Sequence, residues 1–279
     1  MINYLDCGGS RLDLTKPVVM GILNTTPDSF SDGGRFSTIG MALSRALEMY
    51  EQGAQIIDVG GESTRPGAPS VSVEDELQRV LGVIESIRKE TDAVISIDTS
   101  KPEVMRAAVA AGATMINDVR ALRATGAIEV CAELNVPVCL MHMQGEPRTM
   151  QLNPQYDDVV KDVKSFFEER VSACIRGGIA KQRLLLDPGF GFGKALAHNL
   201  SLLKRLNELT EMGFPLLVGI SRKSMLGSVL DNAAVSRRLY GSLAAAVLAY
   251  AAGAKILRVH DVRATVEALK VSHAVLAAS

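Results

Sequence analysis

The sequence has little net charge, few cysteines and no long hydrophobic run. Its 30 basic and 31 acidic residues leave a formal charge of −1, so nothing suggests a binder of nucleic acid or of a membrane surface, which would need a basic face. An anionic ligand would therefore be held by a local cluster of cations. The most apolar stretch, 241–254, is shorter than the roughly 20 residues that span a bilayer. Its alanines and glycines predict a closely packed helix that would suit a subunit contact.

The cysteines and the first residues indicate a reducing compartment. None of the four cysteines forms a Cys-x-x-Cys pair, and Cys139 lies in an apolar, strand-like run where a thiol packs as a small hydrophobe. The N-terminus carries charges early and lacks the apolar segment of a secretory signal. We therefore expect a cytoplasmic protein with reduced thiols.

Apolar runs alternate with amphipathic stretches along all 279 residues. The runs are short, rich in Val, Ile and Leu, and mostly lack alternation, which is typical of strands buried on both faces of a parallel sheet. Between them are helical stretches such as 73–90, with an apolar stripe that includes Val80 and Ile84. The expected strands are residues 18–24, 55–61, 94–100, 115–120, 136–143, 184–191, 215–221 and 255–261.

These eight strand–helix units predict an α/β fold, a (β/α)₈ TIM barrel, for which about 250 residues is usual. The alternative is a doubly wound sheet, which usually has fewer strands and a G-x-G-x-x-G turn that is missing after Asn24. Residues 1–16 precede the first strand, and we interpret them as a short hairpin that plugs the N-terminal end of the barrel. No linker divides the chain, so we expect a single domain over 1–279. The longest loops, expected to be functional lids, are 24–38, 60–72 and 143–155.

Polar side chains end almost every expected strand, and barrel active sites lie at the C-terminal ends of the strands. Any one of these side chains could instead cap the helix that follows it. Because so many converge on one rim, function is the better joint explanation. The strand-end residues are Asn24, Asp58, Glu62, Asp98, Asn117, Asp118, His142, Asp187, Ser221, Arg222, Lys223, Arg258 and His260.

Two further motifs resemble known sites but have the wrong spacing. The sequence GFGFGK, which ends at Lys194, is similar to a phosphate-binding loop. A Walker motif, however, needs glycine where Pro188 stands and Ser or Thr where Ala195 stands. His142 lies near Cys139 but has no second ligand at useful spacing, so we reject a metal site there.

Motifs over nearly the whole chain resemble, in order, those of the bacterial dihydropteroate synthase family of folate biosynthesis. Two signature loops are highly specific: GILNTTPDSFSDGG (21–34) and DVGGESTRPGA (58–68). The pattern is completed by SIDTSKPEV (96–104), IND (116–118), LMHMQGEPRTMQ (140–151), DPGFGFGK (187–194), GISRKSMLG (219–227) and RVHDV (258–262). The resemblance implies a pterin-binding TIM barrel that condenses p-aminobenzoate with 6-hydroxymethyl-7,8-dihydropterin pyrophosphate.

The resemblance assigns the pterin to Asp98, Asn117 and Asp187. A pterin presents an amino group and a ring N–H side by side, and a carboxylate can accept both hydrogen bonds at once. Asparagine can donate and accept at the remaining ring positions. Lys223 resembles the family's lysine between the pterin and the second substrate, although a solvated loop charge is the alternative.

The resemblance also implies a pyrophosphate site and an arylamine pocket. Asn24 would ligate Mg²⁺ together with the diphosphate, since Mg²⁺ prefers oxygen ligands and keeps waters. Phe30 and Asp32 would close over the pterin. The anion clamp for the leaving group would comprise Arg65, Arg258 and His260, although spacing alone favours a structural role for this histidine. The p-aminobenzoate pocket would comprise Thr64, Arg65, Pro66, Phe192, Lys223 and Ser224.

The resemblance implies an SN1-like displacement of pyrophosphate, with sulfonamides competing for the p-aminobenzoate pocket and a homodimer as the assembly. The residues assigned to catalysis are Asp98, Asp187, Lys223, Arg258 and His260. Three alternatives are a pterin-dependent methyltransferase barrel, a Schiff-base aldolase that uses Lys223, and a non-catalytic pterin-binding barrel. The methyltransferase would need neither the pyrophosphate cluster nor the STRPG loop, and this chain has both.

Overall fold

An antiparallel hairpin leads into a parallel barrel in this structure, a computed structural model that describes residues 2–26, 35–63, 70–146 and 149–278. The hairpin consists of β1 (Tyr4–Cys7) and β2 (Ser10–Asp13). Eight parallel strands follow in the spatial order β8-β7-β6-β5-β4-β3-β10-β9, and a parallel bridge between Leu186 and Leu216 closes the ring. The barrel strands are β3 (Val18–Asn24), β4 (Ile56–Gly60), β5 (Val94–Asp98), β6 (Met115–Asp118), β7 (Val138–Met141), β8 (Leu184–Asp187), β9 (Leu217–Val218) and β10 (Ile256–Val259).

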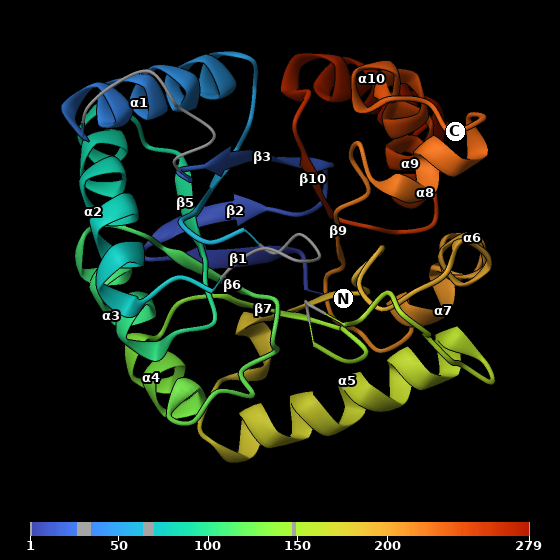
Figure 1. Cartoon of the computed structure of the whole chain (residues 1–279), viewed down its shortest axis with the longest axis horizontal. Helices are drawn as coiled ribbons and strands as arrows, with labels where there is room; N and C mark the ends of the chain where they lie inside the picture. Colours follow the sequence, from blue (N-terminus) through green and yellow to red (C-terminus); the bar gives the residue numbers. More distant parts are fainter. Residues whose placement is uncertain (1, 27–34, 64–69, 147–148, 279) are drawn as a thin grey trace.

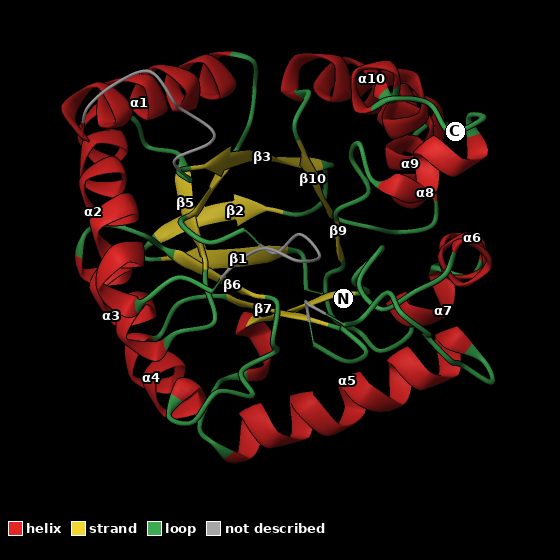
Figure 2. Ribbon diagram, viewed as in Figure 1, coloured by secondary structure: helices red, strands yellow, loops and turns green. Residues whose placement is uncertain are grey.

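Helices alternate with the strands and form a layer around them (Figures 1 and 2). In α2, the Ser72 side chain accepts the backbone N–H of Asp75 and caps the start, while Arg88 and Lys89 lie in the last turn, where the helix dipole favours cations. No helix within the described ranges is long and apolar enough to cross a membrane. The helices are α1 (Arg35–Glu51), α2 (Val73–Glu90), α3 (Pro102–Ala110), α4 (Ala127–Leu134), α5 (Val159–Arg176), α6 (Leu196–Lys204), α7 (Asn207–Thr210), α8 (Ser224–Val229), α9 (Leu239–Ala251) and α10 (Val262–Leu276).

The hydrophobic core has two main parts, one between the strands and the helices and one inside the barrel. Inside the barrel, Leu5 and Leu12 of the hairpin pack with Ile56, Val94 and other residues near the starts of the strands. The hairpin therefore fills the N-terminal end of the barrel, as predicted, and β1 and β2 cross the middle of the view in Figure 1. The polar C-terminal ends of the strands are left for a site at the opposite mouth.

The predicted (β/α)₈ barrel is confirmed, and most strands are shorter than expected. The run predicted over 184–191 ends at Asp187 because Pro188 and Gly189 turn the chain away. Cys139 is fully buried in the inner part of the core, as expected for a small apolar residue, and all four cysteines are free thiols.

Candidate active site

The parallel register brings the ends of the barrel strands to a common mouth. Gly60 at the end of β4 pairs with Asp98 at the end of β5, and Asp98 pairs with Asn117 of β6. Farther round the barrel, Asp187 ends β8 opposite Met141 of β7. Residues that pair across neighbouring strands share a face of the sheet, so Asp98 and Asn117 enter the barrel together.

Arg258 of β10 links three strands inside this mouth. Its Nε lies 2.6 Å from Asp58 Oδ2, and its Nη2 lies 2.7 Å from Asp98 Oδ2. Asn117 Nδ2 donates to the same Asp58 oxygen at 3.2 Å. Charge-assisted hydrogen bonds between a guanidinium and a carboxylate are short and strong, so Asp58 holds Arg258 and Asn117 in a fixed relation.

Asp58 is the residue of this network that the sequence did not assign to the site. In the sequence Asp58 is one of many polar strand ends. In the structure its side chain is fully buried and contacts two predicted site residues, Asn117 and Arg258. Its position two residues before Gly60 in a strand of alternating faces is a signal that could have found it. Asp58 therefore belongs to the polar floor of the mouth.

Burial dominates the electrostatics of Asp98. It raises the pKa of this carboxyl from 3.8 to about 7, because desolvation disfavours the charged form. The Arg258 guanidinium lowers the pKa of Asp98, while the Asp58 carboxylate raises it further. Asp98 can therefore change its charge near neutral pH, and hydrogen-bond donors from a ligand would favour the ionised form.

Asp187 is oriented by the turn that follows β8. Its Oδ1 accepts the backbone N–H of Gly189 at 2.8 Å. Burial raises the pKa of Asp187, while nearby cations lower it. Neither Asp98 nor Asp187 caps the helix that follows it. The N-cap residues of α3 and α6 are Lys101 and Ala195, so the helix-cap alternative is wrong for both aspartates.

Lys223 precedes α8 and reaches the loop that follows β8. Its Nζ donates to the carbonyl oxygen of Phe190 and lies 4.5 Å from the centre of the Phe192 ring. Burial lowers the pKa of Lys223 to about 8, and Asp187 opposes this shift. The alternative that Lys223 is a solvated loop charge is therefore wrong.

Asn24 lies on the side of the mouth formed by β3 and β4. It pairs with Gly60, and a Cβ placed on Gly60 would lie 3.5 Å from Asp98 Cβ and 3.9 Å from Asn24 Oδ1. Because no side chain intervenes, Asn24 and Asp98 face the same space. Within the described ranges, no group of three or more His, Cys, Asp or Glu side chains could hold a metal.

His260 lies beside Ser221 where β10 and β9 end. Ser221 Oγ accepts the backbone N–H of His260 at 3.2 Å and lies 3.1 Å from His260 Nδ1, so the hydroxyl orients the imidazole. The adjacent Arg222 is engaged by Asp261, with 2.9 Å between Nε and Oδ2. Ser224 is exposed at the first position of α8. The structure thus brings His260 and Ser224 to the same end of the barrel as Asp98.

Five residues of the predicted site lie outside the described residues: Phe30, Asp32, Thr64, Arg65 and Pro66. The described residues on either side of 64–69 are held in place. Glu62 Oε1 accepts the backbone N–H of Val71 at 3.3 Å, and Lys101 Nζ bonds both Glu62 and the buried Glu76. These contacts hold Glu62 and Val71 against α2 and the segment before α3.

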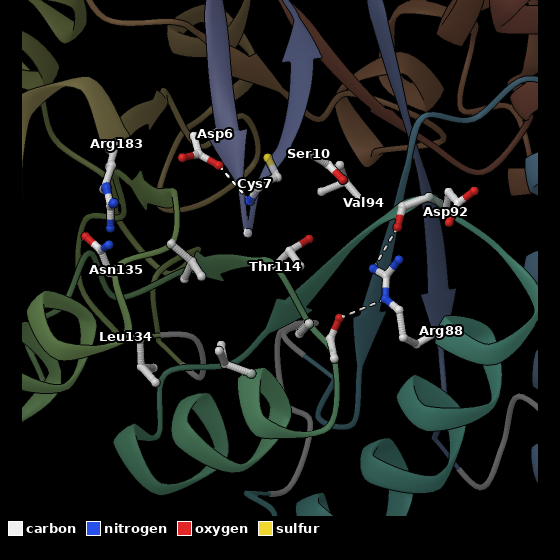
Figure 3. Close-up of a pocket in the computed structure, with 17 residues that line it drawn as sticks. Asp6, Cys7, Ser10, Arg88, Asp92, Val94, Thr114, Leu134, Asn135 and Arg183 are labelled. Atoms are coloured by element: carbon white, nitrogen blue, oxygen red, sulfur yellow. Dashed lines mark hydrogen bonds between the residues drawn. The ribbon is translucent and has the colours of Figure 1, made fainter.

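A separate cavity of about 600 Å³ lies at the opposite end of the barrel (Figure 3). The hairpin contributes Asp6 and Ser10 to it, and Asp92 and Thr114 come from the segments before β5 and β6. No described residue of the predicted site lines this cavity. Since barrel active sites lie at the C-terminal ends of strands, the mouth around Arg258 is the better candidate despite the size of this cavity.

The chain forms a parallel barrel with carboxylates, an amide and cations at its C-terminal mouth, and a family match identifies the class of enzyme to which this barrel belongs. The sequence model of the family described as "Pterin binding enzyme" matches residues 20–260. This range runs from Met20, within β3, past the end of β10, so it covers nearly all of the barrel and the described strand ends at its mouth.

Comparison with individual proteins shows which pterin-binding enzymes this chain is most similar to among those compared. The chain is 58% identical to dihydropteroate synthase of Escherichia coli (strain K12) over 270 residues, which cover 97% of this chain and 95% of that protein. A solved Xanthomonas albilineans dihydropteroate synthase with 4-aminobenzoic acid has a TM-score of 0.95 at 53% identity and covers 100% of both chains. A Yersinia pestis dihydropteroate synthase, solved as a sulfonamide drug complex, has a TM-score of 0.94 at 52% identity over 99% of this chain and 100% of that chain. The chain belongs to the dihydropteroate synthase family.

Proposed function

We propose that this chain is a transferase that condenses p-aminobenzoate with 6-hydroxymethyl-7,8-dihydropterin pyrophosphate, giving 7,8-dihydropteroate and pyrophosphate. The observation that carries the proposal is the placement of Asp98 and Asn117 around Arg258 in a member of the dihydropteroate synthase family. Family membership favours this reaction over the methyltransferase, aldolase and non-catalytic alternatives. The whole chain, 1–279, would act as one pterin-binding domain.

The pterin would bind between Asp187, Asp98 and Asn117. Both carboxylates lie in a buried mouth, where hydrogen bonds from the ring N–H and amino groups are stronger than in water. Arg258 and Asp58 hold Asp98 and Asn117 in register before the ligand arrives. Such preorganisation reduces the entropy lost on binding, so the pterin would be fixed with its methylene carbon toward Lys223.

The leaving pyrophosphate would be held by Arg258, His260 and Arg65. Guanidinium groups bind phosphate oxygens in a bidentate way and stabilise the charge that develops as the carbon–oxygen bond breaks. Asn24 fits a Mg²⁺ site because its amide oxygen is a hard ligand and the diphosphate supplies the others. Bound Mg²⁺ would neutralise part of the negative charge of the diphosphate.

The p-aminobenzoate ring would be held by Phe192, Pro66 and the aliphatic part of Lys223. The 4.5 Å contact between Lys223 Nζ and the Phe192 ring supports a shared wall at this place. Ser224 and nearby backbone N–H groups would hold the carboxylate, with Thr64 as a further residue of the pocket, and Phe30 and Asp32 would close over the pterin and exclude water.

The displacement would be SN1-like. The electron-rich pterin stabilises a cationic methylene carbon, so the carbon–oxygen bond can break before the carbon–nitrogen bond forms. The arylamine nitrogen then attacks this carbon and loses a proton. Asp98, Asp187, Lys223, Arg258 and His260 would act by orientation and electrostatic stabilisation, with no covalent intermediate on the protein.

A homodimer built on α9 and α10 suits the exposed apolar side chains of these helices. Tyr240, Leu248, Val271, Val275 and Leu276 are each more than half exposed. Large exposed apolar patches on soluble proteins usually mark interaction surfaces. Light scattering should therefore report twice the 29.8 kDa of one chain. Free buried thiols are consistent with a cytoplasmic protein.

The test is pyrophosphate release after the protein is mixed with p-aminobenzoate, the pterin pyrophosphate and Mg²⁺. We expect one pyrophosphate for each 7,8-dihydropteroate detected by mass spectrometry. Release that continues at the same rate without p-aminobenzoate would contradict the proposal, because it would indicate that water, and not the arylamine, displaces the pyrophosphate.

A further inference from the structure

The loop after β8, residues 188–194 with the sequence PGFGFGK, wraps around the side chain of its own last residue. Lys194 is only 3% exposed. Its Nζ has three acceptors: Gly189 O at 2.9 Å, Phe192 O at 3.1 Å and His142 Nδ1 at 2.8 Å. An ammonium group has three N–H donors, so every donor of Lys194 has a partner inside the protein.

Two glycines allow the loop to pack this closely. Gly189 and Gly193 have φ values of +68° and +59°, in the left-handed region that favours glycine. A Cβ at Gly189 would collide with the carbonyl oxygen of His142, and one at Gly193 would collide with that of Gln144. The glycines therefore serve the packing of this loop against the chain after β7.

His142 is a neutral partner of Lys194, and its Nδ1 accepts a hydrogen bond when Lys194 is an ammonium group. Burial, reinforced by the Lys194 charge, lowers the pKa of His142 to about 2, so the ring is neutral. With Nδ1 accepting from Lys194, the ring proton lies on Nε2. Burial also lowers the pKa of Lys194 to about 7. The carbonyl oxygens of Gly189 and Phe192 can only accept, so Lys194 Nζ donates to both of them in either protonation state.

The same loop carries contacts of the candidate active site. The backbone N–H two residues after Asp187 donates to Asp187 Oδ1 at 2.8 Å. Phe190 O accepts a hydrogen bond from Lys223, and the Phe192 ring lies 4.5 Å from Lys223 Nζ. The two carbonyls that bond Lys194 lie among these contacts. A shift of the loop would therefore displace Asp187, which is proposed to bind the pterin, together with Phe192 and Lys223, which are proposed to contact p-aminobenzoate.

We propose that Lys194 is a positioning residue, whose Nζ fixes the loop after β8 so that Asp187 and Lys223 face the substrates in one geometry. Lys194 acts through the loop and needs no contact with a substrate. The proposal rests on the proposed function, because it requires the pterin to bind at Asp187.

The test compares Lys194→Met with wild type by calorimetric titration of the pterin pyrophosphate and by steady-state kinetics. The variant keeps a long apolar side chain but leaves two carbonyls and His142 without their donor. We expect pterin binding to weaken by at least about tenfold, since small displacements of site groups cost up to about a hundredfold. We also expect kcat to fall and the KM for p-aminobenzoate to rise.

Two further variants separate positioning from stability. Ile87→Ala makes a cavity at the buried end of α2, close to the start of β5 and so at the end of the barrel opposite the mouth; it should lower the unfolding temperature but bind the pterin within about twofold of wild type. His142→Leu removes one acceptor and should weaken pterin binding about threefold to tenfold, the value of one hydrogen bond.

The outcomes distinguish the two proposals. Wild-type pterin binding and turnover in Lys194→Met would overturn the positioning role. If Lys194→Met does not fold, wild-type values in His142→Leu would overturn it equally. A wild-type protein that fails to bind the pterin pyrophosphate would instead overturn the proposed function.

Discussion

Asp58→Asn should damage both the stability of the barrel and its affinity for the pterin. Asp58 Oδ2 accepts hydrogen bonds from Arg258 Nε at 2.6 Å and from Asn117 Nδ2 at 3.2 Å, and its side chain is fully buried. The substitution keeps the shape but removes the charge. An amide also places an N–H₂ group where one of the two carboxylate oxygens stood, so in either orientation more than one N–H donor is left without an acceptor.

The expected loss of stability follows from the burial of the ion pair between Asp58 and Arg258. Removing one partner of a buried ion pair costs about 3–5 kcal/mol. Here Arg258 is 21% exposed and keeps its second partner, Asp98, at 2.7 Å. We therefore expect the free energy of unfolding to fall by about 2–3 kcal/mol, less than for an isolated pair. Arg258 and Asn117 would lose their fixed relation, so pterin affinity should fall by at least about tenfold.

Urea unfolding and calorimetric titration with the pterin pyrophosphate would measure these two effects. Glu133→Gln is a suitable control, because Glu133 lies 2.7 Å from Arg106 but both side chains are more than half exposed. An exposed pair contributes little, so the control should change the free energy of unfolding by less than about 1 kcal/mol. If Asp58→Asn behaved like this control in both assays, Asp58 would have no role in organising the mouth.

Three other predictions concern the metal, the pH and an inhibitor. A chelator should suppress turnover and added Mg²⁺ should restore it, whereas full activity without metal would reject the role of Asn24. Because burial raises the pKa of Asp98 to about 7, this carboxyl is protonated below pH 7 and cannot accept both pterin donors. Calorimetry should thus show pterin affinity rising from pH 6 to pH 7.5, by at most about tenfold per pH unit, and Asp98→Asn should remove this dependence. A sulfonamide should raise the KM for p-aminobenzoate without lowering kcat, and a purely noncompetitive effect would contradict the shared pocket.

The barrel was predictable because each strand is a short apolar run and each helix has an apolar stripe. The expected strand 18–24 and the expected helix 73–90 match β3 and α2 at both ends. The periodic pattern of α2 predicts that all of its charged residues face solvent. Glu76, however, is fully buried. Glu76 meets Lys101, which belongs to the segment before α3. Helical periodicity carries no information about such a partner.

The candidate site was predictable to the extent that parallel strands end at one mouth. This rule places Asp98, Asn117 and Arg258 together without any knowledge of their contacts. The bond between Arg258 and Asp58 joins residues 200 positions apart, and only strand register and side-chain rotamers determine it. The spacing of GFGFGK likewise excluded a Walker motif but did not reveal the hydrogen bond between Lys194 and His142.

The central claim is that the strand-end carboxylates form a pterin site, and calorimetric titration of Asp187→Ala with the pterin pyrophosphate tests it most directly. Asp187 is buried at the end of β8 and its orientation is fixed by the following turn. We predict that wild type binds the pterin and that Asp187→Ala, although folded by circular dichroism, shows no measurable binding. Binding by Asp187→Ala with the wild-type affinity would contradict the account.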